Sequence, residues 1–217
     1  SVVSIQTALS NGTAKGSGAI IDTEGHIITN NHVISGAQQI QVTLANGNMY
    51  SATLVGTDTT TDLAVIKLDN PPSDLKAVEF ADSDKLAVGE NVMAIGNPLG
   101  ELTFSMSEGI VSCVNRAINV DGTPFNMIQV DCSINPGNSG GALVDDEGKL
   151  IGINTLITSY SGNYSGVGFA IPVNYAINLA QQIIAGETPT HAQLGVSLST
   201  VEGAYAQLAA EGYVQAV

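Results

Sequence analysis

Short apolar segments separated by turn residues constrain the fold of this 217-residue chain more than any other feature. In residues 39–44, Gln and Thr alternate with Ile, Val and Leu, and Asn46-Gly47 separates this run from another at 49–55. An alternating run before Asn-Gly is typical of a β-hairpin. Further strands are expected at 18–22, 63–68, 92–96, 109–114, 127–131, 150–155 and 166–171. Their number and spacing predict an all-β protein with two small barrels.

One helix is expected, at residues 173–185. Its apolar residues recur at helical spacing, and Gly186 ends it. The expected divisions of the chain are a first barrel at about 1–84, a second barrel at about 85–172, the helix at 173–185, a linker at 186–191 and the start of a further domain at 192–217.

The charge of the chain excludes some partners. Twenty acidic and six basic residues give a formal net charge of −14, which repels nucleic acid and anionic membrane surfaces. No apolar run is long enough to cross a bilayer, and no basic-then-apolar leader opens the chain. We expect any targeting or anchoring segment to lie upstream of Ser1.

Two cysteines, Cys113 and Cys132, match no metal-ligand spacing. A disulfide between them cannot be judged without geometry. We expect two buried free thiols, because unpaired cysteine is among the most buried residue types. We expect no metal and no cofactor.

A glycine-rich stretch, Asn-Pro-Gly-Asn-Ser-Gly-Gly-Ala-Leu at 135–143, has the composition of a nucleophile loop. Pro136 fixes its own φ and Gly137 can adopt a positive φ, so the turn can direct the N–H groups of Gly137 and Ser139 at one point. Such a pair of donors would form an oxyanion hole beside the Ser139 hydroxyl. The alternative interpretation is an ordinary glycine-rich turn.

His32 follows an apolar strand, where a turn could present its imidazole as a general base. The alternative is a capping or core histidine. His26 is expected to be solvated in a hairpin, and His191 lies in the expected linker.

Asp62 directly precedes the apolar strand at 63–68. A carboxylate at the start of a buried strand needs a hydrogen-bond donor, and a histidine N–H would supply one. The alternative is a turn carboxylate. Asp58 and Asp69 are expected to be solvated.

His32, Asp62 and Ser139 occur in the chain order of the chymotrypsin triad. With its surrounding motifs the sequence resembles the HtrA (DegP-like) family of trypsin-fold serine proteases, over residues 1–185. The motifs are Thr-Asn-Asn-His-Val at 29–33, Asp-Leu-Ala-Val at 62–65, Gly-Asn-Pro-Leu-Gly at 96–100, Asn-Pro-Gly-Asn-Ser-Gly-Gly at 135–141 and Gly-Val-Gly-Phe-Ala-Ile-Pro at 166–172. Leu-Gly-Val at 194–196 resembles the start of the PDZ domain that follows the protease in this family.

The resemblance implies two six-stranded barrels of the trypsin type, a short C-terminal helix and an endopeptidase that cleaves unfolded or misfolded proteins. His32, Asp62 and Ser139 would be catalytic, and Gly137 and Ser139 would form the oxyanion hole. Residues 96–100 and 158–165 would be activation and specificity loops. The expected substrate-binding residues are Ser133, Asn154, Thr155 and Leu156. The family also implies a homotrimer in the periplasm or on the outer face of the bacterial membrane.

Two residues suggest finer expectations. Asn138 carries no charge to pair with a newly cut N-terminus, so maturation cleavage is not expected to activate the enzyme. Ser133 is expected near the base of the S1 pocket by fold analogy, and its neutrality favours small or medium aliphatic P1 residues.

Two other functions are compatible with parts of the sequence. Gly137-x-Ser139-x-Gly141 formally matches the nucleophile elbow of α/β-hydrolases, but the residues after Ser139 suggest strand, turn and strand where that fold needs a helix. The second rival is a protease-fold peptide-binding or chaperone module without turnover, which the presence of all three triad residue types does not favour.

Overall fold

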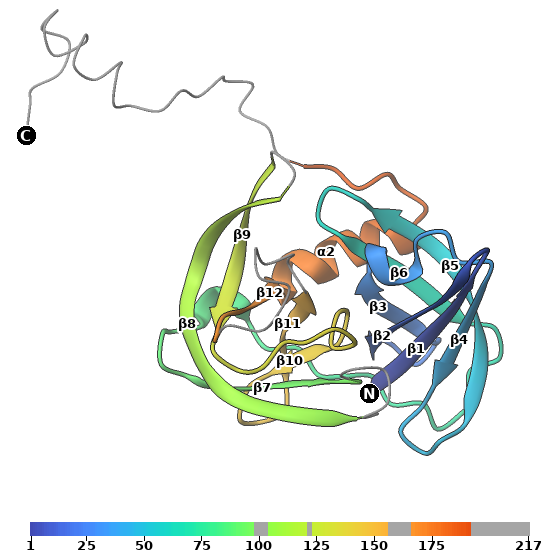
Figure 1. The fold of residues 1–217 in the computed structure, drawn as a ribbon, viewed down its shortest axis with the longest axis horizontal. Coiled ribbons are helices and arrows are strands. Elements are labelled where there is room, and N and C mark those ends of the chain that lie inside the picture. The colour runs from blue at the N-terminus through green and yellow to red at the C-terminus, as the bar shows by residue number, and fades with distance from the viewer. Residues whose placement is uncertain (98–103, 121–122, 156–165, 192–217) are drawn as a thin grey trace, which may run out of the picture.

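The structure is a computed structural model that describes residues 1–97, 104–120, 123–155 and 166–191 (Figure 1). Twelve strands within these residues form two closed barrels of six strands each, and neighbouring strands pair in antiparallel fashion. A helix follows the second barrel. The structure thus confirms the predicted all-β fold of the trypsin type.

The first barrel has the strand order β1-β2-β3-β6-β5-β4. Its strands are β1 Val2–Leu9, β2 Gly12–Ile20, β3 His26–Asn30, β4 Gln39–Thr43, β5 Met49–Asp58 and β6 Leu63–Leu68. The predicted hairpin joins β4 to β5, with Thr43 opposite Met49 and Gly47 at a φ of 84°. Glycine is favoured there because a Cβ disfavours positive φ.

The second barrel has the strand order β10-β11-β12-β9-β8-β7. Its strands are β7 Asn91–Gly96, β8 Ser105–Val120, β9 Thr123–Val130, β10 Ala142–Val144, β11 Leu150–Thr155 and β12 Gly168–Pro172. Strand β8 extends well beyond the predicted 109–114 and curves along the outer side of the barrel with β9 (Figure 1). A 3₁₀ turn, η1 Ser83–Lys85, lies in the segment that joins the barrels.

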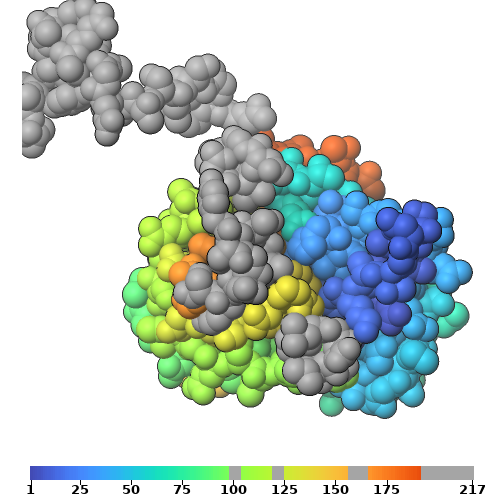
Figure 2. All heavy atoms as spheres, in the orientation of Figure 1, coloured from blue at the N-terminus to red at the C-terminus, as the bar shows by residue number. Residues whose placement is uncertain are grey.

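Three groups of buried apolar side chains hold the molecule together. Each barrel has its own interior cluster, with Ile5 and Ile66 in the first and Val130 and Ile151 in the second. The third cluster lies between them and combines side chains of both barrels with the inner face of helix α2. Burying each such side chain contributes roughly 1.5–3 kcal/mol, so this shared cluster fixes the two barrels against each other. Figure 2 shows them side by side as the blue-to-cyan and green-to-yellow halves.

Helix α2, Val173–Ile184, agrees with the predicted 173–185 and ends before Gly186, which has a φ of 77°. A second helix, α1 Asn31–Ile34, was not predicted because four residues are too few to show a helical period. Residues 192–217, where the start of a further domain was expected, lie outside the described residues.

Candidate active site

His32 lies in the short helix α1, which begins where β3 ends. Its neighbours Val33 and Ile34 are buried in the core of the first barrel, whereas the His32 side chain is 45% exposed. The buried neighbours therefore fix the backbone while the imidazole remains accessible.

The Asp62 carboxylate contacts His32 twice. Oδ2 lies 2.6 Å from the imidazole Nδ1, and Oδ1 accepts the His32 backbone N–H at 2.9 Å. An ionised carboxylate can only accept hydrogen bonds, so Nδ1 is the donor in this pair and Nε2 is left on the opposite side of the ring. Thr155 Oγ1 also donates to Asp62 Oδ2, at 3.4 Å.

The backbone at Asp62 adopts an unusual conformation, with a φ of 57°. A positive φ is uncommon outside glycine and is retained only when surrounding contacts hold it. Two such contacts reach the Asp62 carbonyl oxygen, from Asn30 Nδ2 at 2.9 Å and from the Asn31 N–H at 3.0 Å. The segment that carries His32 therefore also holds the backbone of Asp62.

Ser139 follows a tight turn. The Asn138 N–H donates to the Asn135 carbonyl at 3.0 Å, and Gly137 has a φ of 100°. Proline at the second position and a positive φ at the third are features of a type II turn. Ser139 is 3% exposed, and its carbonyl oxygen accepts the Ser17 N–H at 2.9 Å.

The Ser139 turn packs directly against the segment that leads to His32. A Cβ on Gly140 would lie 3.0 Å from the Asn30 backbone nitrogen and would collide with Thr29 Oγ1. On the other side, a Cβ on Gly16 would lie 2.6 Å from Val33 Cγ1 and 3.2 Å from the Ser139 carbonyl oxygen. Glycine at 16 and 140 therefore permits a close approach between the Ser139 turn of the second barrel and the segment of the first barrel that carries His32.

The four residues expected to bind substrate have different surroundings. Leu156 lies outside the described residues, as do most of the two predicted loops. Asn154 has no exposed surface, and its side chain donates to the Ala142 carbonyl at 2.9 Å. Ser133 is half-buried, and its carbonyl accepts from Ser107 Oγ and Asn138 Nδ2. Thr155 contacts Asp62, which the sequence did not suggest.

Two expectations about charged groups were wrong. His26 is buried at 5% exposure, with Nδ1 2.6 Å from Asp22 Oδ2. Asp58 is buried at 7% exposure. Both were expected to be solvated because they lie near turns. Instead each takes part in a partly buried carboxylate–histidine hydrogen bond, His26 with Asp22 and Asp58 with His191.

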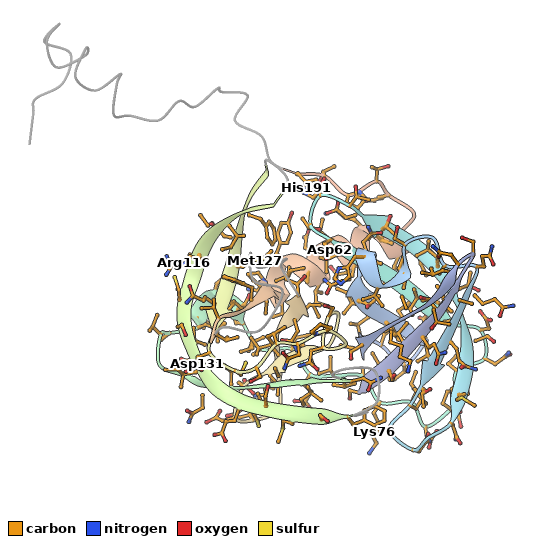
Figure 3. All side chains as sticks on the ribbon, in the orientation of Figure 1. Asp62, Lys76, Arg116, Met127, Asp131 and His191 are labelled. Carbon is orange, nitrogen blue, oxygen red and sulfur yellow. The ribbon has the colours of Figure 1, made fainter. Side chains whose placement is uncertain are left out.

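The partner of Asp58 is His191, 133 residues away in the chain, with its Nε2 3.0 Å from Asp58 Oδ1. His191 Nδ1 lies 2.9 Å from the Tyr175 hydroxyl, and burial together with the Asp58 charge raises the pKa of Tyr175. Asp58 also accepts from the Thr61 hydroxyl, next to Asp62. This network connects the expected linker to the turn that carries Asp62. Figure 3 labels Asp62 and His191.

The cysteines are free, as predicted. Cys132 is buried, and burial with the nearby Asp131 charge raises its pKa to about 12. Cys113, in strand β8, is only half-buried, contrary to expectation.

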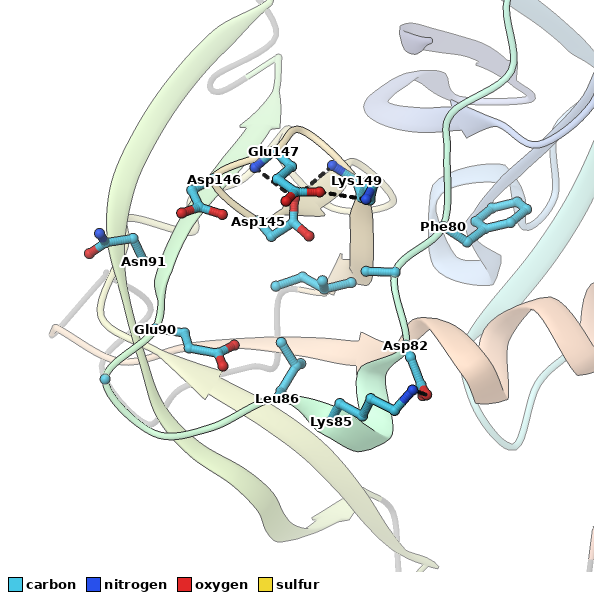
Figure 4. A pocket seen from close by; sticks show the side chains of 13 residues that line it. Phe80, Asp82, Lys85, Leu86, Glu90, Asn91, Asp145, Asp146, Glu147 and Lys149 are labelled. Carbon is cyan, nitrogen blue, oxygen red and sulfur yellow. Dashed lines mark hydrogen bonds and ion pairs between the residues drawn. The ribbon is translucent and has the colours of Figure 1, made fainter.

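A hollow of about 620 Å³ lies away from these residues (Figure 4). Five of the thirteen residues that line it are acidic: Asp82, Glu90, Asp145, Asp146 and Glu147. The hydrogen bond and opposite charges of Lys149 and Glu147 lower the pKa of the Glu147 carboxyl and raise the pKa of the Lys149 ammonium. The described part of the chain has no group of three metal-ligating side chains, and none of its helices is long and apolar enough to span a membrane.

Comparisons with known proteins give consistent results. A family model described as a trypsin-like peptidase domain matches residues 16–153. A probable periplasmic serine protease do/HhoA-like of Haemophilus influenzae is 52% identical over 171 residues, which are 78% of this chain and 36% of that protein. The periplasmic pH-dependent serine endoprotease DegQ of Escherichia coli is 49% identical over 78% of this chain and 37% of its own length. The chain thus spans little more than a third of these relatives.

Among solved structures, the HtrA-type protease AlgW with a tripeptide is 42% identical and superimposes with a TM-score of 0.86. The match covers 95% of this chain and 67% of that one.

Proposed function

The chain belongs to the trypsin-like serine protease domains of the HtrA/DegP family, and from this premise we propose that it is an endopeptidase whose catalytic residues are His32, Asp62 and Ser139. The observation that carries the proposal is the double contact of Asp62 with His32, beside the turn that holds Ser139. The chain order of the three residues, which is that of the chymotrypsin triad, also supports the proposal.

The proposed reaction begins when Ser139 Oγ attacks the carbonyl carbon of a peptide. His32 Nε2 takes the hydroxyl proton and later returns it to the leaving amine, which yields an acyl-enzyme that water hydrolyses. Asp62 holds the Nδ1–H tautomer and stabilises the imidazolium. The N–H groups of Gly137 and Ser139 bind the oxyanion of the tetrahedral intermediate.

The proposed substrates are unfolded or misfolded proteins outside the cytoplasm, with small or medium aliphatic residues at P1. Two relatives that are named periplasmic serine proteases support the location, and an HtrA-type protease solved with a tripeptide supports a peptide substrate. We also propose a homotrimer, which light scattering of the purified chain would test. Ser133, Thr155 and Leu156 remain the proposed substrate-binding residues, whereas the Asn154 side chain is buried and donates to the Ala142 carbonyl in β10.

Cleavage of unfolded casein by the wild-type chain and by Ser139→Ala tests the proposal. The matched control is Ser83→Ala. Ser83 is also a buried serine, and its hydroxyl oxygen accepts the backbone N–H of Asn174 at the start of α2. We expect cleavage by the wild type and the control and none by Ser139→Ala. If the wild type neither cleaves casein nor reacts with a serine-directed probe, even with an activating peptide present, a peptide-binding module without turnover becomes the better account.

A further inference from the structure

Ser17 lies in β2 of the first barrel and has no exposed surface. It contacts the turn at residues 135–139 of the second barrel, here called the nucleophile turn. We propose that Ser17 is a positioning residue for the oxyanion hole, a proposal that rests on the function proposed above. It acts through Gly137 and Ser139, the two residues whose N–H groups would bind the oxyanion.

Ser17 holds the carbonyl group of each of these two residues. Its hydroxyl donates to the Gly137 carbonyl oxygen at 2.8 Å, and its backbone N–H donates to the Ser139 carbonyl oxygen at 2.9 Å. One residue of the first barrel therefore fixes both ends of the Gly-Asn-Ser tripeptide at 137–139.

The direction of the Ser17 hydroxyl is set by a third contact. The Asn97 backbone N–H donates to Ser17 Oγ at 2.9 Å. An N–H group cannot accept a hydrogen bond, so the hydroxyl uses a lone pair there and its proton is directed at Gly137. Asn97 immediately follows β7, and the contact thus joins three segments at one buried oxygen.

The contacts restrict the rotation of the peptide units in the turn. The Gly137–Asn138 peptide is held at both ends, its oxygen by Ser17 and its N–H by the Asn135 carbonyl. The Ser139–Gly140 peptide is also held at both ends, by the Ser17 N–H and by the Asn154 carbonyl. The Ser139 N–H belongs to the peptide unit between these two, and the Gly137 N–H belongs to the unit directly before them. Because each peptide unit is planar, these bonds limit how both N–H groups can turn.

Free rotation here would be costly for catalysis. Glycine at 137 allows several backbone conformations, and only some of them direct its N–H at the oxyanion. Preorganised donors stabilise the transition state because they need not reorient during the reaction. The Ser17 hydroxyl supplies a restraint that the glycine lacks.

The test compares Ser17→Ala with wild type in the full chain. The alanine keeps the backbone N–H to Ser139 and removes both bonds of the hydroxyl, the one to the Gly137 carbonyl and the one from the Asn97 N–H. We expect kcat to fall roughly 10- to 100-fold, less than the 10²–10³ typical of removing an oxyanion donor outright. KM should stay within about twofold, and the pH–rate profile should keep its shape, because Ser17 makes no hydrogen bond to His32 or Asp62.

A peptide boronate distinguishes positioning from general destabilisation, because its tetrahedral adduct resembles the transition state. The Kd of the boronate should rise by the same factor by which kcat falls. Ser83→Ala is again the control and should leave kcat and the boronate Kd unchanged. A Ser17→Ala enzyme with wild-type kcat and boronate affinity would overturn the proposal, as would equal losses in the control.

Two further experiments apply if Ser17→Ala does not fold or if the wild type is inactive. If Ser17→Ala does not fold, Ser17→Cys takes its place, and because a thiol is a weak donor we expect an intermediate loss of kcat. Full activity of Ser17→Cys would overturn the proposal. If the wild type neither cleaves nor reacts with a serine-directed probe, the proposed function fails. Hydrogen exchange at the Asn138 amide then decides whether Ser17 holds the turn: faster exchange in Ser17→Ala than in Ser83→Ala supports it, and equal exchange refutes it.

Discussion

Asp62 binds His32 through both the ring and the backbone, with Oδ2 2.6 Å from Nδ1 and Oδ1 2.9 Å from the backbone nitrogen. The backbone contact fixes the position of the residue, and the ring contact fixes its tautomer. Asp62 itself is held in a left-handed conformation by contacts from Asn30 and Asn31. Contacts within the protein therefore hold the His32–Asp62 pair in place.

Replacing Asp62 by asparagine should nearly abolish turnover while preserving the fold. The amide can present an N–H to the imidazole, which favours the wrong tautomer, and the comparable substitution in a serine protease costs about 10⁴ in kcat. Steady-state kinetics on a fluorogenic peptide would measure the loss. Asp69→Asn, which changes an exposed carboxylate bonded to Thr53, should have wild-type kcat. A loss below tenfold in Asp62→Asn would contradict the assigned role.

Asp58 and His191 should be energetically coupled. Removing the buried Asp58 carboxylate leaves the Thr61 hydroxyl without its acceptor, so Asp58→Ala should cost about 1–3 kcal/mol of unfolding free energy. His191→Ala removes the other partner. A double-mutant cycle in urea should give a coupling of about 0.5–3 kcal/mol. Additive effects would show that the contact contributes no interaction energy.

The neutral Ser133 predicts cleavage after aliphatic residues. A peptide library profiled with the wild-type chain should be led by small or medium aliphatic residues at P1. Ser133→Asp should then raise kcat/KM for Arg or Lys at P1 relative to Val, because the added carboxylate would attract the cation. A wild-type profile led by Arg would disprove the assignment of Ser133, and an unchanged profile in Ser133→Asp would place it outside the pocket.

Cys132 should react slowly with thiol reagents in the folded chain. Burial disfavours the thiolate, and with a pKa of about 12 the group stays protonated at pH 8. In a Cys113→Ser variant, which isolates Cys132, labelling at pH 8 should be far slower than after denaturation. Because pH 8–9 is well below this pKa, the thiolate fraction still increases with pH, and the labelling rate should rise between pH 8 and 9. Rapid labelling of the folded variant would contradict the burial of this thiol.

Local patterns predicted the architecture well. Alternation and the Asn46-Gly47 turn gave the β4–β5 hairpin, and helical spacing gave α2, because both signals depend on neighbouring residues. Helix α1 and the full length of β8 were missed, since neither has a local signal of sufficient length.

The contacts around the candidate site were harder to predict because they join distant residues. The pairing of Asp58 with His191 spans 133 positions, and no local pattern reports it. Ser17 was missed for the same reason: its hydroxyl meets Gly137, 120 residues later. The only sequence signal was a serine between two glycines at 16–18, which is also typical of a turn.

The most direct test of the proposed function is the mass of the intact protein after reaction with a fluorophosphonate, followed by peptide mapping. The account predicts one adduct, located on Ser139, which is absent from Ser139→Ala and forms far more slowly in His32→Ala. Wild-type chain that stays unmodified, or an adduct on another residue that persists in Ser139→Ala, would contradict it.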